Sequence, residues 1–62
     1  MTISFGDQLA CALREVKLRE SLYPRWVKNG RMTRANADAQ IEAMKAIAET
    51  LRPLAEKEEL PL

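Results

Sequence analysis

Between residues 37 and 51 the apolar side chains recur at intervals of four, three, four and three positions: Ala37, Ile41, Met44, Ala48 and Leu51. Because an α-helix turns once in about 3.6 residues, this spacing produces a single apolar stripe, with Ile47 beside it, of the kind that packs against another helix. Thr33 is a favourable N-cap immediately before the pattern. We predict a helix over about residues 34–52, which Pro53 ends or kinks.

A second apolar stripe begins near the N-terminus and consists of Phe5, Leu9, Ala12, Leu13 and Val16. Ser4 can cap this helix, and Asp7 places a negative charge at the positive end of its dipole. Proline disfavours helical geometry at the residue before it, so Pro24 predicts a helix over about residues 5–22. We expect a short helical turn over residues 24–28, which Gly30 closes in the left-handed conformation.

These elements predict an all-α fold, a helical hairpin that forms a single domain over residues 1–62. Leu54 to Glu59 are expected to add a last turn before a frayed tail at residues 60–62. A domain of this length buries only about 60% of its unfolded surface. Cys11, Leu18 and Leu22 lie off the predicted stripe of the first helix. We therefore expect these three residues to form an oligomer interface, and a homo-oligomer to complete the hairpin.

The chain has one cysteine and no histidine, so we expect no disulfide, no metal site and no cofactor. Catalysis requires an activated nucleophile or base, and Cys11 has no imidazole to activate it, so we expect no enzyme. A lone thiol is typical of a reducing compartment, which favours the cytoplasm. No apolar run approaches the length of a membrane span, and no secretory leader is evident at the N-terminus.

Charge is unevenly distributed, because residues 14–34 hold seven of the ten basic groups and residues 35–62 hold six of the nine acids. The predicted turn combines aromatic and cationic side chains, and we take it as the candidate site for a ligand or partner: Tyr23, Arg25, Trp26, Lys28, Arg31 and Arg34. Aromatic faces stack on bases, and arginine binds phosphate through paired hydrogen bonds. Alternatively, Trp26 closes the end of the helical core with Tyr23 packed beside it.

The stretch from Arg14 to Leu51 resembles a group of small uncharacterised helical proteins encoded by phages and prophages. The resemblance rests on a Tyr-Pro-x-Trp-Val element, a Gly-Arg-Met-Ser/Thr element and a following apolar repeat. The matching residues are Tyr23, Pro24, Trp26, Val27, Gly30, Arg31, Met32, Thr33, Ala37, Ile41, Met44 and Ile47.

This resemblance implies a phage protein without catalytic residues that acts in the cytoplasm of the host cell. We expect an anti-defence inhibitor, a binding protein that blocks a host protein or sequesters a small anionic nucleotide signal. A regulator that binds nucleic acid through the basic turn is an alternative, although Asp38 and Glu42 would repel phosphate on the second helix. A purely structural assembly protein is a further alternative.

Overall fold

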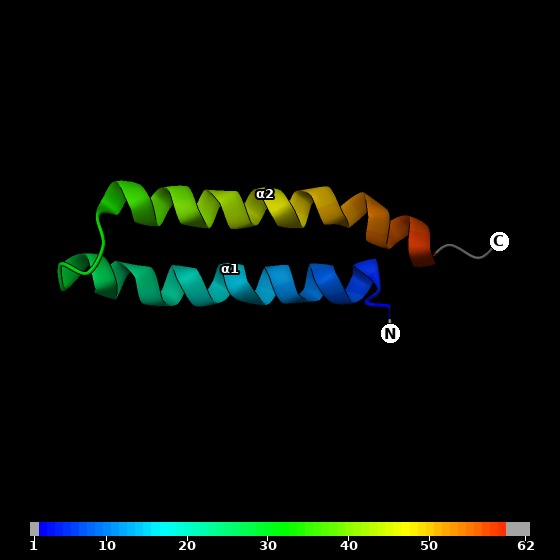
Figure 1. Cartoon of the computed structure of the whole chain (residues 1–62), viewed down its shortest axis with the longest axis horizontal. Coiled ribbons are helices and arrows are strands. Elements are labelled where there is room, and N and C mark those ends of the chain that lie inside the picture. Colours follow the sequence, from blue (N-terminus) through cyan, green and yellow to red (C-terminus); the bar gives the residue numbers. More distant parts are fainter. Residues whose placement is uncertain (1, 60–62) are drawn as a thin grey trace.

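The computed structural model describes residues 2–59. Two helices, α1 (Phe5–Lys28) and α2 (Arg34–Glu59), run antiparallel and side by side, joined by a short loop (Figure 1). The end that holds the loop is referred to below as the turn end, and the end where α1 begins and α2 finishes as the open end. The predicted all-α helical hairpin is confirmed, and the tail predicted at residues 60–62 lies outside the described residues.

α1 starts at Phe5, as predicted, with Ser4 as its N-cap. The Ser4 hydroxyl accepts a hydrogen bond from the backbone N–H of Asp7 at 3.0 Å. The carboxylate of Glu58, at the far end of α2, accepts from the N–H of Phe5 at 3.0 Å and from that of Gly6 at 3.1 Å. Because the first N–H groups of a helix have no partner within the helix, one side chain of α2 satisfies two of these donors in α1.

Pro24 does not end α1, which continues to Lys28, so the predicted end at Leu22 and the separate turn over residues 24–28 are wrong. A proline inside a helix removes one hydrogen bond and costs roughly 3 kcal/mol. The Pro24 ring lies on the exposed side of α1. Tyr23 and Trp26, which lie on either side of it in the sequence, stack on one another.

Pro53 likewise lies within α2: the helix predicted over about residues 34–52 and the last turn predicted over residues 54–59 form one helix that extends to Glu59. Beyond this proline, Ala55 is buried between the helices and Glu58 binds the start of α1. These long-range contacts offset the local cost of the proline. In Figure 1 the last part of α2, drawn in orange and red, turns toward the start of α1.

Among the described residues, the core is a thin seam of five buried side chains: Ala12, Val16, Ala37, Ala48 and Ala55. Small side chains allow the two helices to approach closely. Both predicted apolar stripes face the seam. Their small residues are buried in it, and their larger apolar side chains lie along its edges. Leu9, Ile41, Met44 and Leu51 are half-buried. Phe5 and Leu13 are 40% and 38% exposed, because two helices alone cannot cover them.

The hairpin is elongated, with dimensions of 51 × 19 × 16 Å and a radius of gyration of 14.5 Å. A compact domain of this length would have a radius of gyration of about 11 Å. The elongated shape leaves several large apolar side chains in contact with water. Within residues 2–59, neither helix contains a stretch that is both long and apolar enough to cross a membrane.

Candidate binding site at the turn end

The backbone of the loop has the hydrogen-bonding pattern of a helix that ends in glycine. The N–H of Arg31 donates to the carbonyl of Trp26 at 2.8 Å, and the N–H of Gly30 donates to the carbonyl of Val27 at 3.1 Å. Gly30 has a φ of 77°, which confirms the predicted left-handed conformation. This pattern holds Arg31 directly beyond the end of α1.

The loop ends at Thr33, whose Oγ1 accepts a hydrogen bond from the N–H of Asn36 at 3.1 Å, so the predicted N-cap of α2 is confirmed. The first turn of α2 contains no acid, and its first residue is Arg34. A helix N-terminus carries partial positive charge, which stabilises an anion and disfavours a cation. Arg34 therefore lies where its own charge is unfavourable for the helix.

Tyr23 and Trp26 form a stacked aromatic pair in the last two turns of α1, with ring centroids 5.4 Å apart and an interplanar angle of 26°. Both residues are half-buried. Each ring therefore has one part against the protein and one part in solvent. An aromatic surface of this kind can pack in the hairpin and also receive a flat ligand.

The four predicted cations all lie around this pair and the loop, and all are exposed: Arg25, Lys28, Arg31 and Arg34. Arg25 and Lys28 belong to the last turn of α1, where positive charge is favourable at the negative end of the helix dipole. No acid occurs between residues 21 and 37, so the turn end is a region of one charge sign.

Arg19 was not predicted as part of the site, yet it lies against one ring of the aromatic pair. Its guanidinium lies 5.9 Å from the centroid of the Tyr23 ring. The same guanidinium donates to the Glu15 carboxylate and to the backbone carbonyl of Gln40 in α2, both at 2.9 Å. The spacing of Glu15, Arg19 and Tyr23, four residues apart on one helix face, is the sequence signal that could have identified this group.

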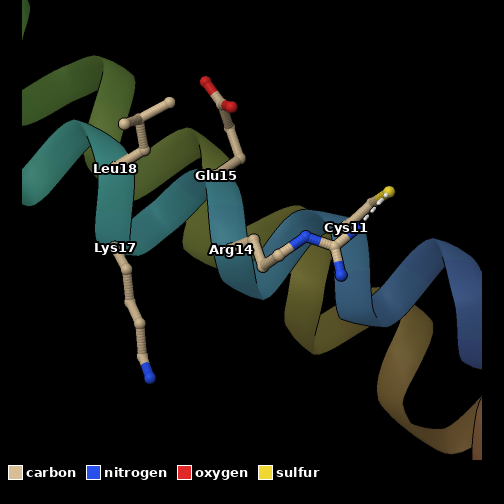
Figure 2. Close-up of a pocket in the computed structure, with 5 residues that line it drawn as sticks. All are labelled: Cys11, Arg14, Glu15, Lys17 and Leu18. Atoms are coloured by element: carbon tan, nitrogen blue, oxygen red, sulfur yellow. Dashed lines mark hydrogen bonds between the residues drawn. The ribbon is translucent and has the colours of Figure 1, made fainter.

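The predicted oligomer interface lies away from the turn, along the middle of α1. Cys11 and Leu18 are exposed, whereas Leu22 is half-buried. Cys11 and Leu18 line an open depression together with Arg14, Glu15 and Lys17 (Figure 2). The Arg14 guanidinium donates a hydrogen bond to the Cys11 sulfur at 3.2 Å. Nothing in the described part of the chain covers this depression.

Within residues 2–59, no three His, Cys, Asp or Glu side chains come together in a group that could hold a metal ion. The exposed guanidinium and ammonium groups of the turn end attract anions, and its aromatic pair offers a surface for stacking.

Comparison with known protein families, with curated proteins and with solved structures finds no match to this chain.

Proposed function

We propose that this chain is a non-catalytic binding protein that self-associates and uses its turn end to bind an anionic partner. In this proposal it is a phage-type protein that acts in the cytoplasm of the host cell. It blocks or sequesters a host factor, either a host protein or a nucleotide immune signal. Binding alone produces the effect, so no reaction is catalysed.

The observation that carries the proposal is the juxtaposition of a half-exposed aromatic pair with four exposed cations in a segment without acids. Arg31 and Arg34 also stand beside the N-terminus of α2, where no acid of the first turn neutralises the helix dipole. An anion bound there would relieve this repulsion and interact with the dipole. The aromatic pair would supply a stacking face for a base or for a planar side chain.

The phage context comes from the resemblance of residues 14–51 to small phage and prophage proteins. Small phage proteins without catalytic residues commonly act by occupying a host protein or a host signal. The exposed apolar side chains along the hairpin support the self-association part of the proposal, because an elongated monomer leaves them in water.

Nucleic-acid binding is the second candidate, because stacking and positive charge also suit a single strand. Asp38 and Glu42, one and two turns beyond Arg34, are exposed and would repel a long phosphate backbone. A small anion avoids this repulsion. The two candidates differ in that binding of a polymer weakens steeply with salt and strengthens with polymer length.

Calorimetric titration tests the site with three probes: a cyclic dinucleotide, a nucleoside triphosphate and a single-stranded RNA oligonucleotide. Arg31→Ala is compared with Lys57→Ala, which removes the same charge from an exposed position in the last turn of α2. We expect Arg31→Ala to weaken binding of the preferred probe about tenfold or more, as for the loss of a charged hydrogen bond of about 1.5–3 kcal/mol. Lys57→Ala should bind like the native chain.

An equal loss from both variants would show that only net charge matters and would overturn the site. Binding that grows with RNA length would favour the nucleic-acid candidate. If none of the three probes binds, mass spectrometry of proteins retained by the native chain, but not by Arg31→Ala, tests for a host protein. A chain that assembles and binds nothing at all would support a structural protein instead.

A further inference from the structure

The two sides of the hairpin, which flank the seam, differ in character. Arg19 reaches from α1 to the carbonyl of Gln40 and marks one side, referred to below as the Arg19 side. The ion pair between Glu20 and Lys45, at 3.6 Å, marks the other side. Each side therefore contains a contact between the helices that identifies which residues belong to it.

The Arg19 side carries exposed apolar residues from both helices. On α2, Ile47 and Leu54 follow Gln40 at intervals of seven residues, which return to nearly the same direction of the helix. On α1, Leu22 follows Glu15 by seven residues, and Figure 2 shows Glu15 and Leu18 projecting from the same flank. Leu18 is 51% exposed, Ile47 49% and Leu54 37%.

The other side carries charged residues from both helices, most densely toward the turn end. Glu20, Asp38, Glu42 and Lys45 line an open depression there, together with one apolar residue, Ile41. Nearer the open end, a smaller depression is lined by Leu9, Ala10, Leu13 and Ala55 together with Arg52 and Glu56. Leu13, at 38%, is less exposed than Leu18 and Ile47, so a hydrophobic partner is expected on the Arg19 side.

Charge is also polarised along the 51 Å length of the hairpin. The turn end carries four cations and no acid. At the open end, residues 2–10 and 49–58 hold four acids, Asp7, Glu49, Glu56 and Glu58, against two bases, Arg52 and Lys57. Two copies packed in parallel would bring like charges together at both ends, whereas two antiparallel copies would pair each basic end with an acidic end.

We propose that the Arg19 side is covered by a second copy of the chain in antiparallel orientation, which forms a four-helix bundle. Full overlap places the two-fold axis at the middle of the hairpin. Leu18 and Ile47 lie within two residues of the midpoints of α1 and α2, so the two most exposed of the apolar residues named on this side meet at the axis. In the same arrangement Leu54 of each copy lies near the level of Leu22 in the other.

The dimensions of the hairpin fit this arrangement. A side of 51 × 19 Å offers on the order of 1,000 Å², compared with about 800 Å² per partner in a standard stable interface. A staggered pair would bury only part of this area. The antiparallel dimer rests on the self-association in the proposed function, and it separates the two turn ends, so that each dimer carries two independent binding sites.

The arrangement makes a distance prediction for cysteines. Leu18 lies beside its own counterpart at the axis, so cysteines there can form a disulfide, which requires a Cα separation of about 4.4–6.8 Å. Cys11 precedes Leu18 by seven residues, roughly 10 Å along the helix, so the two copies of Cys11 are held roughly 20 Å apart. In a parallel pair, by contrast, each of these positions would lie at the same level along the bundle as its counterpart.

The test is mild oxidation followed by non-reducing electrophoresis. Three proteins are compared: the native chain, a Cys11→Ser/Leu18→Cys variant, and a Cys11→Ser/Lys17→Cys control whose cysteine projects to the opposite flank of α1 from Leu18 (Figure 2). We expect most of the Leu18→Cys variant to become a covalent dimer and the other two proteins to remain largely uncrosslinked. Efficient crosslinking of the native chain through Cys11 would overturn the antiparallel order.

Cysteine at position 18 could itself weaken the interface, so sedimentation equilibrium provides a second test that measures the oligomeric state directly. The native chain should be a dimer at micromolar concentration, and Leu18→Glu and Ile47→Glu should each convert it to a monomer. Ala39→Glu, at an exposed position of α2, should leave the dimer intact. A native monomer, or a dimer that survives both substitutions, would overturn the proposal. A monomer that still binds its ligand at Arg31 would overturn only the dimer, and an antiparallel dimer without ligand would overturn only the binding site.

Discussion

The two ends of the hairpin satisfy the unpaired backbone groups of their helix termini in different ways. At the turn end, Arg31 and Gly30 donate to carbonyls of residues three to five positions earlier. At the open end, the Glu58 carboxylate accepts from Phe5 and Gly6, more than fifty positions away in the chain. The local solution, which the Thr33 cap completes, uses none of the four cationic side chains of the turn. The long-range contact, by contrast, engages the carboxylate of Glu58 in holding the two helices together.

The largest expected effect is at the turn end, where Gly30→Val should lower the free energy of unfolding by about 2 kcal/mol, because a β-branched residue is strained at positive φ. No atom lies within 4 Å of the Cβ that a substitution would add, so the loss is conformational and not steric. Thermal unfolding at matched protein concentration measures it. Gly30→Asn is the control and should lose less, since asparagine tolerates this conformation. Equal losses from both variants would contradict this explanation.

At the open end, Glu58→Gln keeps the size of the side chain but removes the charge and one of the two acceptor oxygens. We expect a loss of about 1 kcal/mol, at the low end for a charged hydrogen bond because the group is exposed. Glu56→Gln removes the same charge from the same end and should change stability by no more than a few tenths of a kcal/mol. If the two variants unfold alike, the contact between Glu58 and α1 does not stabilise the hairpin.

The smallest expected effect is a change in the free energy of unfolding at the turn end. It is informative because its sign should differ between two cations of the same site. Arg34→Glu places an acid at the start of α2 and should stabilise the fold by about 0.5 kcal/mol while abolishing binding of an anionic probe. Arg25→Glu places an acid in the last turn of α1 and should destabilise it by a similar amount. Urea unfolding and calorimetric titration of both variants provide the comparison. A loss of stability from Arg34→Glu would show that this cation has a structural role.

The same division between local and long-range interactions explains how much of the fold could be predicted. Ser4, Gly30 and Thr33 act through hydrogen bonds within a few residues, and all three were identified from the sequence. The C-terminal ends of the two predicted main helices were misplaced, because Pro24 and Pro53 carry a strong local signal for termination, although a last helical turn over residues 54–59 was expected. The contacts that override that signal, such as those of Ala55 and Glu58 with α1, depend on the packed hairpin.

The candidate site shows a similar limit. The cations and aromatic residues of the turn could be named from their types, and their placement around one loop follows from the hairpin. The packing of Tyr23 beside Trp26 was one of two alternatives from the sequence, and the four-residue spacing of Glu15, Arg19 and Tyr23 could have grouped those three residues. The stacked geometry and the hydrogen bond from Arg19 to Gln40 could not be predicted, because they depend on side-chain geometry and on a carbonyl of the other helix.

The alanine seam has a consequence for how this protein tolerates mutation. In an ordinary core the damaging substitutions shorten large side chains and leave cavities. Here four of the five buried side chains are alanines, so little can be removed, and almost every substitution enlarges the residue and forces the helices apart. In a comprehensive mutational scan, Ala12, Ala37, Ala48 and Ala55 would accept little beyond glycine and serine, while the larger residues along the edges of the seam would vary freely among apolar types. The positions most sensitive to substitution would then be those with the smallest side chains.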